Sequence, residues 1–180
     1  MSILNTKKLL AGGLIAMSMA FTGCLTDDTK DPPANTGTAL TEVKQDTVWN
    51  LQGPTGKLGA YDLVVGAGVA SAGPATSKDL LDQSSVGGAG VTFPKTWTSG
   101  NGTTFVMGSS VSYATATDSA AIKGFAAGTA VTATTVLAPG TVVLAKLRGT
   151  ARIAVISIVA VNETSGDNLD NIVFKYKRTP

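Results

Sequence analysis

The run Arg152–Val161 constrains the fold of this chain more than any other segment, because it is apolar on both of its alternating faces. Side chains alternate across a β-strand, so a strand of this kind must be covered on both sides. Apart from Ser157, every residue of Ile153–Val161 is apolar. We therefore expect a central strand, and the fold must supply packing partners for both of its faces.

Two neighbouring segments predict an antiparallel meander around this strand. Val142–Leu147 precedes it as a second apolar run, and a turn rich in Gly, Asp and Asn follows it. The final segment, Asn171–Arg178, alternates between an apolar face and a face that carries lysines. The apolar face contains Ile172, Phe174 and Tyr176, and the opposite face contains Val173, Lys175 and Lys177. We expect this last strand to be solvated on one side.

From Asp46 onward, short apolar runs rich in Thr, Val and Ala are separated by Gly and Pro. Strands are expected over 47–51, 60–65, 91–97, 103–107, 131–136, 141–148, 152–162 and 171–178, and the Gly-rich segment 66–71 is interpreted as a softened strand or bulge. Short helices are expected over 77–83 and 117–128, the second with Thr117 as N-cap and Ile122, Phe125 and Ala126 on one face. The predicted class is all-β: an antiparallel sandwich or meander-based barrel with one or two short helices.

The first residues have the order of a secretory signal: Lys7 and Lys8, then an uncharged apolar run over Leu9–Phe21, then small residues. A helix over that run would rise about 20 Å, short of the roughly 30 Å hydrocarbon core of a bilayer. We therefore expect export with removal of residues 1–23, rather than a transmembrane span.

The tetrapeptide Phe21-Thr22-Gly23-Cys24 resembles the lipobox of bacterial lipoproteins, in which an apolar residue and two small residues precede the cysteine. The resemblance implies cleavage before Cys24, diacylglycerol on its sulfur and acylation of the new amino group. Several acyl chains matter, because one chain alone gives only marginal, reversible membrane binding. Phe21 stands where that family usually has Leu, and an ordinary signal peptide with a chance cysteine is the alternative.

Residues 24–45 are polar and rich in Asp, Thr and Pro, a composition that cannot bury enough apolar surface to order itself. We expect a flexible lipidated tether that carries a β-rich globular domain over 46–180. Leu25, in place of Asp after the cysteine, implies the outer membrane by resemblance to lipoproteins of Gram-negative bacteria, with the domain facing the periplasm or the cell surface. Loss of Lys7 and Lys8 from the 14 basic residues leaves 12, equal to the 12 acidic residues, so nucleic acid is not favoured as a partner.

The sequence contains no histidine, and its one cysteine is the expected lipid site. Metal sites built on imidazole or thiolate are therefore excluded, and no cofactor is expected. Gly166–Asn171 offers carboxylate and amide oxygens, but it lacks the spacing of a calcium loop. A hairpin turn is the preferred interpretation of that segment.

Segment 139–178 is similar, in its apolar patterning, to the end of haem-binding surface lipoproteins of the HmuY type. The resemblance implies an all-β domain. It does not imply haem binding by this chain, because the best-known haem ligation of that family uses histidines.

Trp97 and Asn101 are the candidate ligand-binding residues, because Trp97 precedes the loop 98–103 and loops at strand ends often carry binding sites. Core packing is the competing interpretation of Trp97, since large aromatic side chains of β-rich proteins mostly lie in the core. Asp62 falls inside an expected strand, and we interpret it as an ion-pair or exposed-face residue rather than as a catalytic acid.

These features predict a membrane-anchored, exported lipoprotein whose domain is a non-enzymatic binding or structural module of the cell envelope. Its expected partners are the membrane, through the lipid on Cys24, and a glycan or an envelope protein. The alternative is a polysaccharide hydrolase, because a glycosidase can work with two carboxylates and no histidine. No catalytic residue is assigned.

Overall fold

Nine strands form two antiparallel sheets in residues 37–84 and 92–180, which are the residues that the computed structural model describes. The five-stranded sheet contains, in spatial order, β1 (Glu42–Trp49), β9 (Asn171–Arg178), β8 (Ile153–Asn162), β7 (Val142–Lys146) and β6 (Thr104–Met107). The four-stranded sheet contains β3 (Ala67–Val69), β2 (Ala60–Asp62), β4 (Leu80–Asp82) and β5 (Trp97–Thr98). One α-helix, α1 (Asp118–Ala127), and the 3₁₀ turns η1 (Ala75–Ser77) and η2 (Leu147–Gly149) complete the elements. The predicted all-β class is confirmed.

Strand β8 is covered on both faces over Ile153–Ile158, as its sequence predicts, whereas Val159, also predicted to be covered, is 40% exposed. Its residues Ala154, Ile156 and Ile158 belong to the core that the two sheets share. The alternate residues Ile153 and Val155 belong to a second core on the outer face of the five-stranded sheet, where α1 packs. The strand that is apolar on both sides therefore separates two hydrophobic layers.

Strand β9 has the predicted alternation and pairs with β8 in an antiparallel hairpin. Ile172, Phe174 and Tyr176 are fully buried, whereas the lysines between them are partly exposed. The ring of Phe174 meets the rings of Tyr61 and Trp97 edge to face, with centroids 5.0 and 5.5 Å apart. Such contacts lock the two sheets together.

The first strand pairs with the last, and it begins earlier than the sequence predicts. β1 lies at an edge of its sheet and pairs with β9 along the register Thr47↔Val173. It starts at Glu42, and Leu40 before it is buried, so the expected domain start at Asp46 is four residues late. Because β1 is an edge strand, its exposed Glu42 and Lys44 also discourage pairing with another chain.

Several predicted elements differ from the structure. Segment 77–83 contains β4 rather than a helix, because Leu80 and Asp82 are buried at alternate positions and Leu81 pairs with Ala60 and Thr98. Segment 131–136 makes only isolated bridges, and of the expected strand 91–97 only Trp97 joins a sheet, with residue 91 outside the described residues. The Gly-rich segment 66–71 forms the short strand β3, as interpreted from the sequence.

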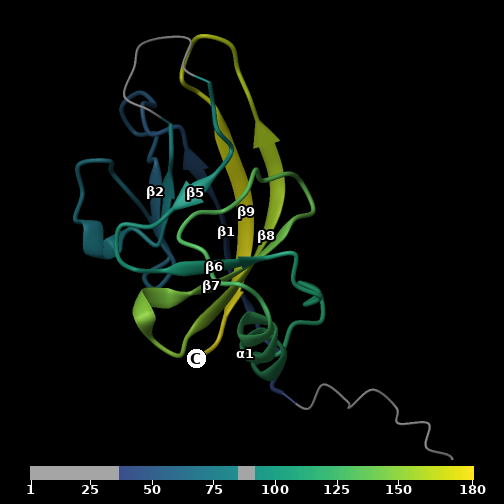
Figure 1. Cartoon of the computed structure of the whole chain (residues 1–180). Coiled ribbons are helices and arrows are strands. Elements are labelled where there is room, and N and C mark those ends of the chain that lie inside the picture. The colour runs from purple at the N-terminus through teal and green to yellow at the C-terminus, as the bar shows by residue number, and fades with distance from the viewer. Residues whose placement is uncertain (1–36, 85–91) are drawn as a thin grey trace, which may run out of the picture. The chain divides into compact units, whose positions relative to one another are not determined.

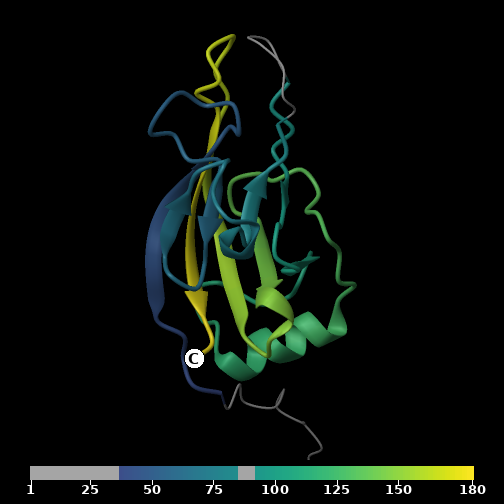
Figure 2. The same cartoon turned by 90° about the vertical axis from the view of Figure 1, so that its left-hand side faces the viewer.

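Figure 1 and Figure 2 show α1 at the lower end of the five-stranded sheet, beside the C-terminus, while the β8–β9 hairpin turn lies at the opposite end. The described chain also enters at the lower end, because the backbone N–H of Asp118 donates to the carbonyl of Thr38 at 2.9 Å. The two ends of the described chain and α1 therefore meet at one end of the sheet.

Candidate functional site

Helix α1 begins at a side-chain cap and is held against the sheet by small residues. The hydroxyl of Thr117 accepts from the N–H of Ala120 at 3.2 Å, which satisfies one of the free donors of the first turn. Ala121 is fully buried against the outer core of the sheet. A Cβ added at Gly124 would lie 2.5 Å from Val111 and 3.2 Å from Leu144, so the close approach of the helix requires glycine there.

The helix face that the sequence predicts as apolar turns outward. Ile122 is 49% exposed, Ala126 is exposed and Phe125 is half-buried. The prediction that these three residues share a face is compatible with the helix; of the three, Phe125 packs in part against the outer core of the sheet, and Ile122 and Ala126 stay exposed. Small residues occupy the buried positions of α1 because larger side chains there would keep the helix axis farther from the sheet.

Two adjoining cavities follow this exposed side of α1, and we call them together the α1 groove. One, of about 440 Å³, is lined by residues that include Ile122, Phe125, Lys146, Ala151 and Ile153. The other, of about 360 Å³, is lined by Thr38, Ala39, Leu40, Thr41, Val43, Asp118, Arg152, Arg178, Thr179 and Pro180. Their linings share no residue, but they contain the consecutive residues Arg152 and Ile153, and two positions of α1 one helical turn apart, Asp118 and Ile122.

The α1 groove combines apolar walls with an excess of basic side chains. Lys146, Arg152 and Arg178 line it, and none of the three forms a salt bridge with another described residue. The carboxylate of Asp118 is the acidic side chain among the lining residues, and it accepts locally from the N–H of Ser119 at 2.6 Å. The groove can therefore receive a group that is both apolar and anionic.

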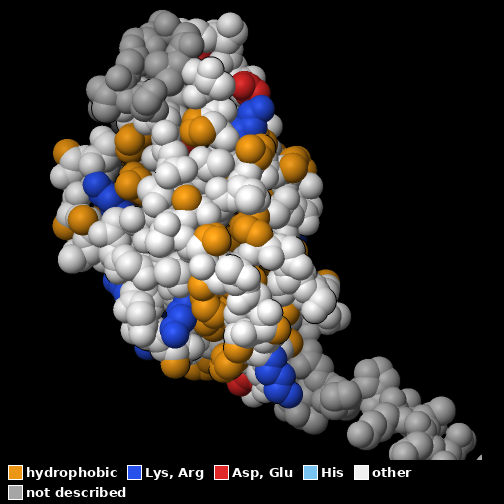
Figure 3. All heavy atoms as spheres, in the orientation of Figure 1, with side chains coloured by type: hydrophobic (Ala, Val, Ile, Leu, Met, Phe, Trp, Pro, Cys, Tyr) orange, Lys and Arg blue, Asp and Glu red, His pale blue; other side chains and the backbone are white. Residues whose placement is uncertain are grey.

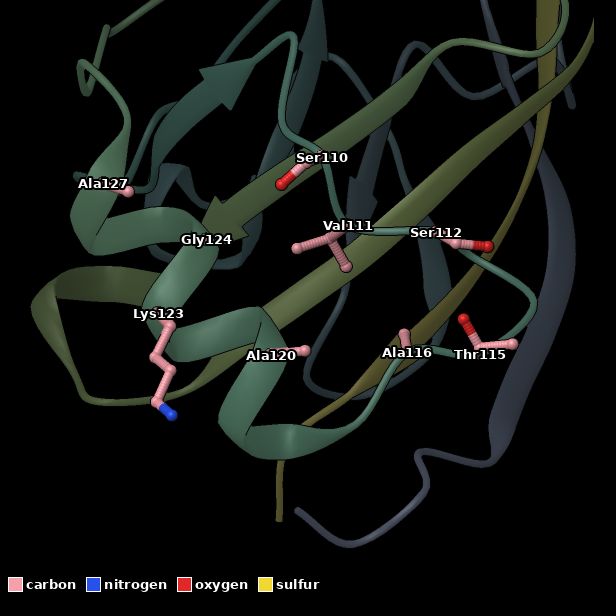
Figure 4. Close-up of a pocket in the computed structure, with 9 residues that line it drawn as sticks. All are labelled: Ser110, Val111, Ser112, Thr115, Ala116, Ala120, Lys123, Gly124 and Ala127. Atoms are coloured by element: carbon pink, nitrogen blue, oxygen red, sulfur yellow. The ribbon is translucent and has the colours of Figure 1, made fainter. Parts of the chain in front are cut away.

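A further cavity of about 400 Å³ lies on the other side of α1, between the helix and the loop that precedes it. Figure 4 shows Val111 between this loop and the helix, whereas the side chain of Lys123 points away from the loop. Its lining consists mainly of small side chains and hydroxyl groups, among them Ser110, Ser112 and Thr115. This lining contains no carboxylate, so it offers no acid–base pair for catalysis.

The strongest electrostatic feature of the fold is a buried cluster around Arg148, between the two sheets. Arg148 adopts a left-handed backbone conformation, with φ of 52°. Its guanidinium donates to both carboxylate oxygens of Asp79, at 3.0 and 2.8 Å, and its Nη2 lies 2.6 Å from Asp62 Oδ1. Asp79 is fully buried and Asp62 nearly so. Two-point binding of a carboxylate by arginine gives strong, directional hydrogen bonds.

Each carboxylate of the Arg148 cluster has further hydrogen bonds. Asp62 Oδ1 accepts from the N–H groups of Val64 and Val65 at 2.9 and 2.8 Å. Burial raises the pKa of Asp62, but the bond from Arg148 and the two backbone N–H groups outweigh it, so the pKa is lower than its ordinary value. The ion-pair interpretation of Asp62 is confirmed, and both carboxylates are committed to a structural role.

The structure places Trp97 in the core and Asn101 beside the Arg148 cluster. Trp97 is fully buried, so its ring has no exposed face on which a ligand could stack, and the ligand-binding prediction is corrected in favour of core packing. The amide of Asn101 donates to Asp79 at 2.8 Å and to the carbonyl of Thr76 at 3.2 Å. The two residues therefore do not combine into an open binding platform.

Within residues 37–84 and 92–180, no three side chains of His, Cys, Asp or Glu gather into a possible metal site. In the same residues, no helix has the length and apolarity needed to cross a membrane. Cys24, the expected lipid site, lies outside the described residues. The turn expected at Gly166–Asn171 belongs to the hairpin connection between β8 and β9, in which Asp167 accepts from the hydroxyl of Thr164 at 2.6 Å.

Sequence reasoning missed the two arginines of the α1 groove and the central position of Arg148. Arg148-Gly149 directly follows a strand, and a tight turn of this kind brings a long side chain back over the sheet. Its acidic partners lie far away in the sequence, so no local pattern could have identified them. No protein-family model, curated protein or solved structure matches this chain.

Proposed function

We propose that this chain is an exported lipoprotein, held on a membrane by acyl groups on Cys24, whose β domain is a non-enzymatic binding or structural module of the cell envelope. The observation that carries the proposal is the order of the first residues: two lysines, an apolar run and Phe21-Thr22-Gly23-Cys24. The single cysteine of the chain stands at the position where the lipobox resemblance requires it.

The chemistry of the described residues supports a module without catalysis. Asp62 and Asp79 are buried and both bind the same guanidinium of Arg148. A glycosidase would need one protonated and one free carboxyl group facing a cleft. This pair of carboxylates therefore does not support the polysaccharide-hydrolase alternative. The outer-membrane location stays a proposal that rests on Leu25.

Metabolic labelling with a radioactive fatty acid tests the anchor. The wild-type chain is expected to incorporate label and to fractionate with membranes, whereas Cys24→Ser should do neither. Mass spectrometry of the mature protein should find its modified amino terminus at residue 24. Label in the Cys24→Ser variant, or an unmodified amino terminus at another residue, would overturn the proposal.

A further inference from the structure

The described chain enters the fold at the rim of the α1 groove. Thr38 and Ala39 line the groove, Ala39 pairs with Thr117 at the start of α1, and the Thr38 carbonyl accepts from Asp118. A segment that leaves the domain toward Cys24 therefore starts beside the groove and not at the hairpin end of the molecule.

The length of the intervening segment limits how far this end can lie from the lipid. From Cys24 to Thr38, a flexible chain spans roughly 20 Å on average, and a fully extended one spans at most about 50 Å. On the proposed function, Cys24 lies at the membrane surface. The α1 end of the domain then stays close enough for direct contact with lipid headgroups.

The side chains at this end match an anionic membrane surface. Figure 3 shows orange hydrophobic and blue Lys and Arg side chains side by side around the position of α1. Exposed Ile122 and half-buried Phe125 supply the apolar strip, and Arg152 and Arg178 supply charge without an ion-pair partner in the described chain. Lys146, Arg152 and Arg178 come from strand ends beside α1 and not from the helix itself. The surface as a whole therefore combines apolar contact area with positive charge, the two contributions that hold a peripheral surface on an anionic membrane.

Within the described residues, the opposite end of the sheet lacks this set of unpaired basic side chains. In the β8–β9 turn, Asp170 is buried, Glu163 is paired with Lys95 at 2.6 Å, and Asp167 is exposed. An anionic surface would therefore attract the α1 end more strongly than the hairpin end. The charge distribution favours one orientation of the domain.

We propose that the α1 groove is a docking surface for anionic phospholipid, so that the domain rests on the membrane through α1. The apolar strip contacts the acyl boundary, and Arg152, Arg178 and Lys146 contact lipid phosphates. The proposal uses the lipid anchor only to bring this surface near the membrane. The surface chemistry itself can be tested without the anchor.

The test uses the chain from residue 24 onward with Cys24→Ser, mixed with two kinds of vesicle. Vesicles of phosphatidylcholine that contain phosphatidylglycerol should carry the protein into the pellet at low salt and release it at high salt, because salt screens exposed charges. Vesicles of phosphatidylcholine alone should not bind it. Absence of binding to the anionic vesicles at low salt would overturn the proposal. Binding to a polyglutamate peptide without binding to these vesicles would overturn it as well.

Two pairs of matched variants locate the surface. Arg152→Glu should weaken binding by more than about fivefold, the effect of one basic residue near an anionic surface. Lys57→Glu makes the same charge change beside Trp49, away from α1, and should bind as the wild type. Ile122→Asp should likewise lose binding, whereas Val136→Asp, at another exposed aliphatic side chain, should not. Equal losses within either pair would contradict the assignment.

The outcomes separate this inference from the lipid anchor. Fatty-acid labelling at Cys24 with no vesicle binding by the Cys24→Ser chain would leave the anchor intact and reject the docking surface. Vesicle binding by the Cys24→Ser chain without fatty-acid labelling of the wild type would reject the anchor and leave the docking surface intact. Circular dichroism of each variant shows whether a loss of binding reflects unfolding.

Discussion

Asp79 shows how much a single buried residue can depend on distant parts of the chain. Its carboxylate accepts hydrogen bonds from Leu63, Asn101 and Thr103, in addition to the two from Arg148. Each bond offsets part of the cost of placing a charge in the interior. The buried carboxylate depends most on its one charged donor, so the cluster is sensitive to the loss of Arg148.

Arg148→Met should therefore destabilise the domain strongly. The substitution keeps an aliphatic stem but leaves two buried carboxylates without a counter-charge, and we expect a loss of about 3–5 kcal/mol. Arg152→Met is the matched control, because Arg152 is exposed and has no salt bridge in the described chain; it should change stability by less than about 0.5 kcal/mol. Urea unfolding followed by tryptophan fluorescence measures both, and similar losses would contradict the structural role of Arg148.

The sequence left an ion pair or an exposed face open for Asp62; the structure shows the ion pair, whose partner the sequence did not indicate. A charged residue between Tyr61 and Leu63 in an apolar strand needs a counter-charge, which is a local argument. The partner Arg148 comes from the turn after β7, and this pairing exists only once the two sheets face each other. Trp97 is similar, because its burial depends on Phe174 from the last strand. Residue roles that depend on distant contacts are not encoded in local patterns.

At the scale of single elements, apolar periodicity was informative where a segment is long. The central strand, the final strand and the Thr117-capped helix all follow from their patterns, because many residues must agree in phase. The segment 77–83 is too short for its apolar periodicity to distinguish a helix from a strand. Its pairing with β2 and β5 overrides the local preference for helix. The sequence pattern placed Ile122, Phe125 and Ala126 on one face of α1, but it could not show which face packs on the sheet, where close packing favoured Ala121 and Gly124.

Strand β8 provides the prediction that belongs to this scale. Ile156→Asp places an unpaired charge in the fully buried face of β8, so the variant should lose its cooperative melting transition. Val159→Asp is in the same strand, at a side chain that is 40% exposed, and it should still melt cooperatively. A normal melting curve for Ile156→Asp would contradict the position of β8 between two hydrophobic layers.

At the scale of the whole molecule, the Arg148 cluster links the stability of both sheets to pH. The pKa of Asp62 is lower in the folded chain than its ordinary value of 3.8, so the folded state favours the ionised form. The stability that this gives is present above the unfolded pKa and is lost as the pH falls through the folded pKa. The pH dependence of the Asp82 contribution to stability has the opposite sign. Burial raises the pKa of Asp82, so its contribution to stability falls as the pH rises.

Asp62→Asn should therefore flatten the acid side of the stability profile. The variant should be less stable than the wild type at pH 7. The difference should shrink as the pH falls below about 4, where Asp62 of the unfolded wild type becomes protonated, and further as the pH falls through the lower folded pKa. Denaturant unfolding at pH 7, 4 and 3 measures the two curves. A constant difference between wild type and variant at all three pH values would show that the Asp62 charge does not contribute.

The pairing of β1 with β9 has a consequence for how the domain can form. Strand β1 has no partner until residues 171–178, which form β9, are present. A chain that emerges from a channel with its amino terminus first therefore carries an unpaired β1 for almost its whole passage. Contacts between such distant segments form slowly, because a long loop must close before they stabilise anything. Passage through a narrow pore in an unfolded state is therefore compatible with this topology. Without β9, strand β1 would lose the strand with which it pairs in the sheet. Strand β8, now in the middle of the sheet, would become an edge strand.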